Sequence, residues 1–435
     1  MKMTNTDFER WLKQGRGKAA ASIQNGEQSH YQDALLHACT HNLCYDPESE
    51  ETRGYYLANL IQMAADPRPF REGVIAVLHS PTDELQPNDI LQLFALARHW
   101  AADGDEGVRR LLYDFFSREG FVRAEVGCGA YLVKMDGLDA LLFVVPFLKR
   151  VEERFRLWQF NHLASALEER DGKEAAAQKL ADAASNNPEL TRLRELAHSE
   201  DDRLAKEGQD LADTWNTPNA PYSEIRRQMR DGIPNMVSLL IWAKRATEDE
   251  LKDLAADMFS ETDQRRIWNY LLVFSCRRFP GSIAPLIEVA RTANPFLSHA
   301  ATRVLANIDE PEVRTLGRDL LATSQRCCLG VRLLARRSEP GDYGLIEEAL
   351  QRDMHGSAYH ALCLAVLDFV KENAVDEAFD SLELLFENTF SSDCRRRAVE
   401  YLVALNHLPD WMRDECRHDA EARTRELARG ATEQQ

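Results

Sequence analysis

Two histidines and two cysteines stand within the eight residues from His37 to Cys44, which read HACTHNLC. Imidazole nitrogens and cysteine thiolates are the usual ligands of zinc. In a helix each residue advances about 100° around the axis, which puts Cys39 on the apolar side. His37, His41 and Cys44 share the opposite side and form at most a three-ligand patch. Because no CxxC or HExxH pattern completes such a site, we expect a polar helix face here, with no metal and no cofactor.

A second short stretch, KQGRGK at residues 13–18, has the glycine and lysine content of a phosphate-binding loop. It lacks the G-x-x-x-x-G-K-[ST] spacing, and no strand pattern precedes it. We therefore expect a turn that leads into a helix, with Lys18 exposed.

Basic side chains share one face on each of three predicted helices in the second half of the chain. The apolar residues of each helix recur at helical spacing and leave the basic residues on the far side. These basic residues are His299 and Arg303, then Arg332 and Arg336, then Arg396 and Arg397. Because each helix is the second of a predicted hairpin, we expect the six residues to align into a stripe that binds an acidic or other anionic segment. The alternative is ordinary ion pairing within each helix, for example between Arg396 and Glu400.

Arg265, Arg266 and Trp268 place two arginines beside an aromatic ring. Together with Tyr270, this combination resembles the basic groove with aromatic side chains by which HEAT-like DNA glycosylases hold damaged DNA, and the resemblance implies a contact with nucleic acid. Aromatic packing between neighbouring helices is the alternative, and we favour it. No Ser-His-Asp or Cys-His spacing identifies a catalytic group, so no catalytic residue is predicted.

The elements that position these residues are predicted to be helices throughout. Apolar residues recur at i, i+3, i+4 and i+7 between Pro, Gly and Asn-Pro breaks, and alternating β-branched runs are absent. After residue 280 a helix–turn–helix unit of roughly 40 residues repeats about three times. We therefore expect an all-α protein built from stacked helical hairpins.

The stretch AATRVLANIDEPEVRTLG, at residues 300–317, resembles a HEAT repeat, in particular the HEAT-like repeats of the bilin-lyase group. The similarity lies in the small pair Ala300-Ala301, the packing position Leu305, an acidic-Pro turn and the Val313-Arg314 start. It extends over about residues 280–405 and is weaker before them. The resemblance implies an α-solenoid, in which stacked hairpins share one continuous core.

The predicted domain boundaries follow from composition. Residues 1–185 form an N-terminal helical-repeat domain, and residues 186–222 form a charged, exposed helical connector that ends in the Pro- and Asn-rich stretch NTPNAPYS. Residues 223–420 form a C-terminal HEAT-like repeat domain. Residues 421–435 are predicted to be a frayed, solvated tail.

Charge limits the partners that this chain can bind. The net charge is −18, and it divides into −11 over residues 1–220, +2 over 221–345 and −9 over 346–435. A negative electrostatic field repels nucleic acid at long range. Only residues 221–345, whose net charge is slightly positive, lack this repulsion. No apolar run reaches the roughly 20 residues of a membrane helix, so no membrane partner is expected. The nine cysteines and the polar N-terminus favour reduced thiols and a cytoplasmic location.

Together these features predict a non-catalytic scaffold or adaptor that binds a protein partner on its concave face. The resemblance to HEAT repeats also leaves two other functions open. One is a HEAT-like nucleic-acid-binding protein or DNA glycosylase, which the acidic charge disfavours. The other is a chaperone or lyase that handles a small ligand, as the bilin-lyase-type repeat implies.

Overall fold

The computed structural model describes residues 5–26, 28–47, 50, 53–123, 127–197, 199, 203, 221–231, 236–354 and 356–430. Every regular element in these ranges is a helix, and none is a strand, so the predicted all-α class is confirmed. The chain divides into two compact units. Unit 1 comprises residues 1–205, 390–396 and 409–435, and unit 2 comprises residues 206–389 and 397–408.

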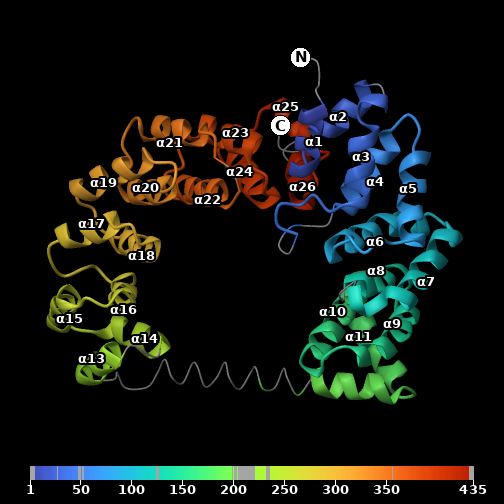
Figure 1. Ribbon diagram of the computed structural model, residues 1–435, viewed down its shortest axis with the longest axis horizontal. Helices are drawn as coiled ribbons and strands as arrows, with labels where there is room; N and C mark the ends of the chain where they lie inside the picture. The colour runs from blue at the N-terminus through green and yellow to red at the C-terminus, as the bar shows by residue number, and fades with distance from the viewer. Residues whose placement is uncertain are drawn as a thin grey trace. The chain divides into compact units, whose positions relative to one another are not determined.

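Unit 1 contains the N-terminal helices and the last two helices of the chain (Figure 1). Its helices are α1 (Asn5–Gln14), α2 (Lys18–Asn25), α3 (Gln32–Thr40), α4 (Gly54–Met63), α5 (Arg68–His79), α6 (Pro87–Ala102), α7 (Glu106–Arg123), α8 (Gly127–Asp136), α9 (Leu138–Val144), α10 (Glu153–Asp171), α11 (Lys173–Ala184), α25 (Asp410–Cys416) and α26 (Ala422–Gly430), with the short 3-10 helices η1 (Gln28–His30) and η2 (Val145–Arg150). From α3 to α6, each helix packs on the second helix after it, so that α3 contacts α5, α4 contacts α6, α5 contacts α7 and α6 contacts α8. A single apolar core runs through the unit and includes Ala420 from the far end of the chain.

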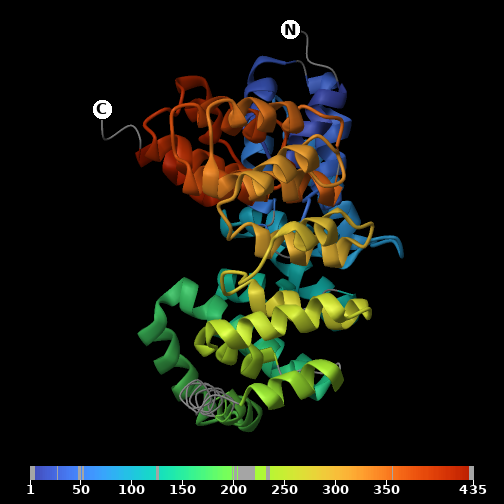
Figure 2. The same cartoon turned by 90° about the vertical axis from the view of Figure 1, so that its left-hand side faces the viewer.

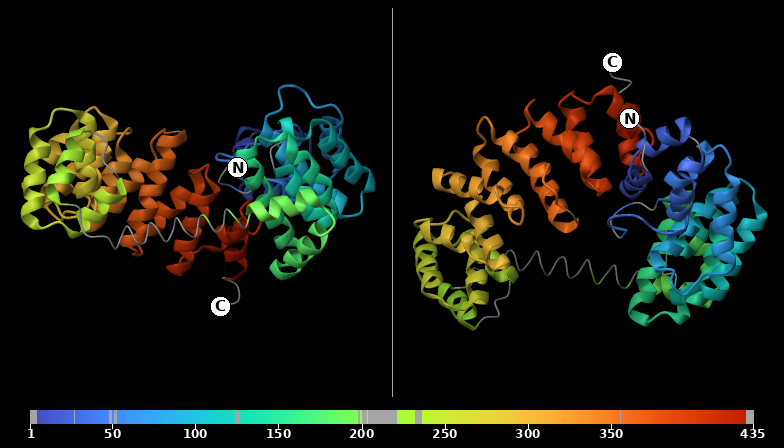
Figure 3. Two further views of the ribbon diagram at one scale, coloured as in Figure 1. Left: turned by 90° about the horizontal axis from the view of Figure 1, so that it is seen from below. Right: turned by 45° about the horizontal axis from the view of Figure 1, so that its top comes forward.

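Unit 2 contains the middle of the chain (Figure 2). Its helices are α13 (Tyr222–Asp231), α14 (Met236–Arg245), α15 (Glu248–Ser260), α16 (Gln264–Phe274), α17 (Ala284–Arg291), α18 (Pro295–Leu305), α19 (Pro311–Leu321), α20 (Cys327–Leu334), η3 (Ala335–Arg337), α21 (Asp342–Leu350), α22 (Gly356–Glu372) and α23 (Ala378–Asn388); α24 (Ser392–Ala404) begins in unit 1 and continues in unit 2. The hairpin partners α15–α16, α17–α18, α19–α20 and α21–α22 pack together. Consecutive even-numbered helices from α14 to α22 also pack against one another (Figure 3).

Four arginines tie successive hairpins together through the ends of helices. Arg277 donates to the carbonyl oxygens of Ala243 and Lys244, and Arg326 donates to those of Arg291 and Thr292. The other bonds run from Arg352 to the carbonyl of Leu321 and from Arg170 to those of Lys134 and Met135. Each acceptor lies at a helix C-terminus, where carbonyls lack partners within the helix and the helix dipole attracts a cation. The two residues of each bond are 31 to 36 positions apart along the chain.

The division into units differs from the predicted domains at the C-terminus. Residues 390–396 and 409–420 of the predicted domain 223–420 belong to unit 1. The predicted frayed tail is a helix over residues 422–430, and its Thr424 and Ala428 side chains are buried. The physical reason is a set of buried ion pairs with the N-terminal helices, described below.

The first part of the predicted connector is not exposed as the sequence predicts. Residues 188–197 are helical, and Leu190 and Leu193 are buried in the core of unit 1. Most of the remaining connector, residues 204–220, lies outside the described residues.

Candidate anion-binding site

Three arginines from two successive hairpins of unit 2 line one hollow. Arg303 extends from α18, Arg332 from α20 and Arg336 from η3, around a cavity of about 310 Å³. These are three of the six residues that the predicted basic stripe contains. A fourth residue of the predicted stripe, His299, contacts Arg332, which is 33 positions away in the chain. The structure thus brings together basic side chains from distant parts of the sequence.

The phase of each helix explains why these side chains reach the hollow. On α18 the side chains of Ala301, Val304 and Leu305 are buried in the core, so Arg303 is left exposed. On α20 Val331 and Leu334 are buried, and Arg332 is only partly covered. Because residues at i and i+4 lie on the same face, Arg336 continues that face into η3.

In the described part of the chain, none of the three arginines forms an ion pair with a carboxylate. Arg332 Nη1 lies 3.4 Å from His299 Nε2, and Arg336 Nη2 donates to Asn307 Oδ1 at 3.3 Å. Asn307 is fixed in turn by its Nδ2 atom, which donates to the carbonyls of Ser275 and Arg303 at 3.2 Å each. The guanidinium groups of Arg332 and Arg336 are therefore positioned by neutral partners and keep free donors.

Electrostatics at the cluster favour a neutral His299. Burial lowers the pKa of His299 below its ordinary value of 6.5, and the positive charges of Arg332 and Arg303 lower it further. A neutral imidazole accepts a hydrogen bond at Nε2, which matches its contact with Arg332. An anion bound at the arginines would reverse this effect and favour the protonated ring.

Two carboxylates of α22 also line the hollow, Asp368 and Glu372. Asp368 accepts a hydrogen bond from Arg397 at 3.1 Å, so its charge is already compensated. Glu372 has no ion pair among the residues that the structure describes, so three arginines face one uncompensated carboxylate and the hollow keeps a positive balance inside an acidic protein.

Arg396 and Arg397 do not join the cluster as unpaired cations. Arg396 pairs with Asp393 at 2.5 Å within its own helix, and Arg397 pairs with Asp368. Ion pairing within one helix therefore applies to Arg396, whereas Arg397 pairs with a carboxylate of α22, and the predicted stripe does not extend to either residue as a free charge.

The predicted group of Arg265, Arg266 and Trp268 separates into two parts. Arg266 lies 3.4 Å from Glu261 in an ion pair. Arg265 and Trp268 line a second hollow of about 340 Å³, together with Phe296 of α18. Trp268 keeps 37% of its surface exposed, so aromatic packing between helices accounts for only part of its side chain.

The HACTHNLC segment is not a continuous helix, so the phase argument fails at its end. Helix α3 stops at Thr40, and His41 has extended backbone angles. The His37 and His41 rings are tilted by 35° with centroids 4.3 Å apart, and Cys44 N donates to Asn42 Oδ1 beyond the helix. Cys39 is buried as predicted. Among the described residues no three His, Cys, Asp or Glu side chains converge in a way that could hold a metal.

The glycine-rich KQGRGK stretch receives the C-terminal segment of the chain, a role that local spacing does not reveal. Arg16 Nε and Nη2 donate to the two carboxylate oxygens of Glu415 at 2.6 and 2.8 Å, and both side chains are buried. Gly15 has φ +68° and accepts a hydrogen bond from Ala420 N at 2.9 Å. A Cβ at Gly17 would lie 1.9 Å from the Glu415 carbonyl oxygen, so only glycine fits there.

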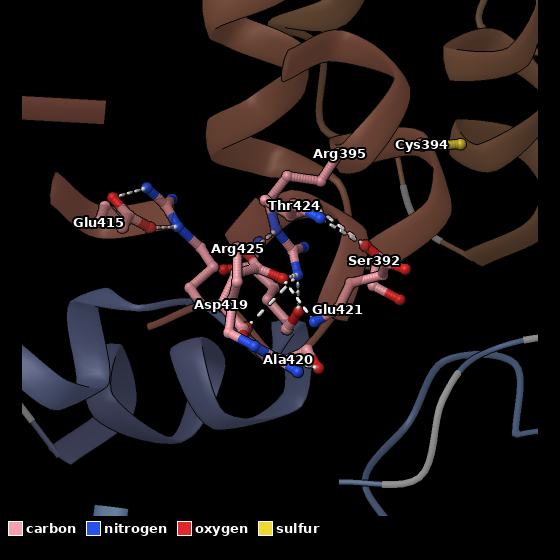
Figure 4. A network of polar contacts seen from close by, with 12 residues as sticks. Ser392, Cys394, Arg395, Glu415, Asp419, Ala420, Glu421, Thr424 and Arg425 are labelled. Carbon is pink, nitrogen blue, oxygen red and sulfur yellow. Dashed lines mark hydrogen bonds and ion pairs between the residues drawn. The ribbon is translucent and has the colours of Figure 1, made fainter. Parts of the chain in front are cut away.

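A second buried ion pair completes this contact (Figure 4). Arg395 is fully buried and donates to both carboxylate oxygens of Asp419 at 2.7 and 3.2 Å. Its Nη2 atom also donates to the Gln14 carbonyl at 2.7 Å. These bonds join residues from both ends of the chain within unit 1.

No family model, curated protein or solved structure matches this chain. Within the described residues, no helix has both the length and the apolar character needed to span a bilayer.

Proposed function

We propose that this protein is a non-catalytic cytoplasmic scaffold or adaptor that binds an acidic segment of a protein partner. The binding face is the even-numbered helix row of unit 2, and the observation that carries the proposal is the hollow of Arg303, Arg332 and Arg336. Three guanidinium groups gather there without a carboxylate partner in the described part of the chain. Repulsion between the three positive charges destabilises the unliganded cluster, and a bound anion would offset this repulsion.

The chemistry of arginine supports a carboxylate-bearing ligand. A guanidinium is a planar fork of donors that matches the two oxygens of a carboxylate, and such charge-assisted bonds are stronger than neutral ones. Arg332 and Arg336 are held by single contacts with His299 and Asn307, which leaves most of their donors available.

We further propose that the hairpins form an α-solenoid of HEAT-like repeats. The succession of contacts between even-numbered helices and the recurring arginine-to-carbonyl bonds support a repeated unit. In such an array each repeat contributes a few contacts to one long surface, which suits an extended peptide.

Nucleic acid is a less favoured ligand for the same site. A duplex approaching the hollow would meet a net charge of −18, together with Glu372, which lines the hollow. An extended run of glutamates carries one charge per about 3.3 Å, roughly half the density of a duplex, and a peptide can confine those charges to the part that meets the arginines. No described observation favours a glycosylase or a lyase over a binding protein.

The test is binding of a fluorescein-labelled glycine–serine peptide that carries a short run of glutamates, measured by fluorescence anisotropy. The full chain should bind it, and Arg303→Glu combined with Arg336→Glu should weaken binding at least about tenfold. Arg278→Glu makes the same type of charge change at an exposed residue that does not line the hollow, and it should change affinity little. Absence of binding by the unmodified chain, or equal losses in both variants, would overturn the proposal.

A further inference from the structure

The second hollow of unit 2 presents two large aromatic rings to solvent. It is lined by Trp268 of α16 and Phe296 of α18, with Arg265 and the polar side chains of Gln264 and Asn294 at its edge. Phe296 is 75% exposed and Trp268 is 37% exposed. Exposed aromatic rings beside an arginine are the residue types that dominate binding energy at protein interfaces.

The chain holds Phe296 in its exposed position through the start of α18. Asn294 caps the helix, since its Oδ1 atom accepts hydrogen bonds from the backbone N–H groups of Phe296 and Leu297 at 2.9 and 3.2 Å. Its Nδ2 atom donates to Gln264 Oε1 at 2.7 Å, which ties α18 to the helix that carries Trp268. The two rings therefore belong to one fixed surface formed by adjacent helices.

This hollow and the arginine cluster lie along the same face of α18. At about 100° per residue, Phe296, His299 and Arg303 fall within about 60° of one another around the helix axis. All three are exposed, and His299 contacts Arg332 of the next even-numbered helix. The rise of the helix separates Phe296 from Arg303 by about 10 Å along its axis. An extended peptide covers that distance in about three residues.

We propose that the acidic segment bound at the arginine cluster also carries one bulky apolar side chain, about three residues from its acidic group, which enters the hollow of Trp268 and Phe296. This inference rests on the proposed function and specifies its ligand. Charge complementarity fixes the acidic part, because Arg265 has no ion pair within the described residues and adds a further cation beside the rings. The ligand is thus recognised at two points, one by charge and one by aromatic contact.

Three peptides separate the two points of recognition. The first is the glutamate-bearing glycine–serine peptide used above. The second has a tryptophan placed about three residues from the glutamates. The third keeps the tryptophan and replaces the glutamates by glutamines. Each is titrated by anisotropy against the full chain and against Trp268→Ala and Phe296→Ala, with Trp158→Ala of unit 1 as the matched control at an exposed tryptophan.

The expected result is that the added tryptophan tightens binding by about tenfold or more. Trp268→Ala and Phe296→Ala should remove that gain and leave the affinity for the glutamate-only peptide unchanged, and Trp158→Ala should have no effect. If the glutamate-only peptide binds but the tryptophan adds nothing, or if the gain survives in Trp268→Ala, the second point of recognition is wrong and the proposed function stands. If neither acidic peptide binds, both are wrong. Circular dichroism confirms that each variant keeps its helical content.

Discussion

His299 is the titratable residue whose protonation is coupled to the arginine cluster. The groups that face it are Arg332 and Arg303, and together with burial they lower its pKa below 6.5 in the free protein. A bound carboxylate favours the imidazolium and raises that pKa, so binding takes up a proton in the interval between the two values. Above the raised pKa the ring is neutral in both states and affinity no longer depends on it.

Affinity for the glutamate-bearing peptide is therefore expected to rise as the pH falls from about 7.5 to about 5.5, a range in which glutamate stays ionised. Anisotropy titrations at several pH values measure this slope. In His299→Gln the slope should flatten, because glutamine keeps a polar side chain but does not titrate. A slope that is unchanged in His299→Gln would show that another group takes up the proton.

The cysteines differ sharply in their access to solvent. Cys276 is exposed, whereas Cys39, Cys128 and Cys416 are buried, and burial raises the pKa of each of these three thiols. Since the thiolate is the reactive form, native protein treated with iodoacetamide should be alkylated at Cys276 well before the buried residues. Peptide mass spectrometry of samples taken over time measures the order in which the cysteines are alkylated. Alkylation of Cys39 or Cys128 at the rate of Cys276 would contradict the described packing.

At this scale, helical phase alone predicts which arginines point away from the core. It places Arg303, Arg332 and Arg336 correctly because their neighbours Val304, Val331 and Leu334 are strongly apolar. It does not predict that Arg397 is neutralised, because the partner Asp368 belongs to a different helix and lies 29 residues away. The pattern of apolar residues along one helix does not predict which side chains of another helix it contacts.

At the scale of single elements, the arginine-to-carbonyl bonds have a measurable effect on stability. Arg326 donates to the Thr292 carbonyl at 2.8 Å and to the Arg291 carbonyl at 3.2 Å, at the C-terminus of α17. Arg326→Ala should lower the free energy of unfolding by about 1–3 kcal/mol, since these are charge-assisted bonds to otherwise unsatisfied carbonyls. Arg326→Lys should recover part of the loss because it keeps the charge but not the planar fork.

Urea denaturation followed by circular dichroism measures this difference, with the slope of the transition as a check that the unfolded state is unchanged. Arg278→Ala is a suitable control because Arg278 is exposed and close in sequence to another of these arginines, Arg277. Equal stability of Arg326→Ala and Arg278→Ala would show that the helix-end bonds contribute nothing.

The sequence predicts some helix boundaries better than others. The Asn-Pro and Glu-Pro turns before α18 and α19 are predicted well because proline fits the first turn of a helix and asparagine caps it. The end of α3 is missed, since no proline or glycine follows Thr40. The chain leaves the helix there because the Asn42 backbone N–H is bound by Asp89 Oδ1 at 2.6 Å, a residue 47 positions away.

For the whole molecule, the two ends of the chain stabilise the same unit. Arg16 and Glu415 form a buried bidentate pair across 399 residues of sequence. Glu415→Gln leaves the Arg16 guanidinium buried without its counter-ion, so unit 1 should lose about 3–5 kcal/mol of stability. Glu426→Gln removes only an exposed pair with Arg423 and should cost at most about 1 kcal/mol.

Limited proteolysis and thermal denaturation of the two variants give the comparison. In Glu415→Gln, cleavage is expected to appear first within unit 1 and the C-terminal helices, while peptide binding by unit 2 persists. Equal resistance of both variants would contradict the role assigned to this ion pair.

The sequence contains no local signal for this contact between the chain ends. KQGRGK has the composition of several kinds of turn, and HDAEARTREL at residues 418–427 resembles a solvated helix because its carboxylates and arginines are numerous. Only the folded structure shows that Arg16, Arg395 and Asp419 are among the least exposed charged side chains of the chain. The helical class and the repeat pattern are local properties and are predictable, whereas the grouping of distant segments is not.

The central claim is that the arginine hollow of unit 2 selects its ligand by charge, and exchanging the charges tests it most directly. The unmodified chain and the Arg303→Glu/Arg336→Glu variant are each titrated with the glutamate-bearing peptide and with the same peptide carrying lysines at those positions. The unmodified chain should prefer the glutamate peptide and the variant the lysine peptide, each by about tenfold or more. The same peptide preference in both proteins would contradict the claim.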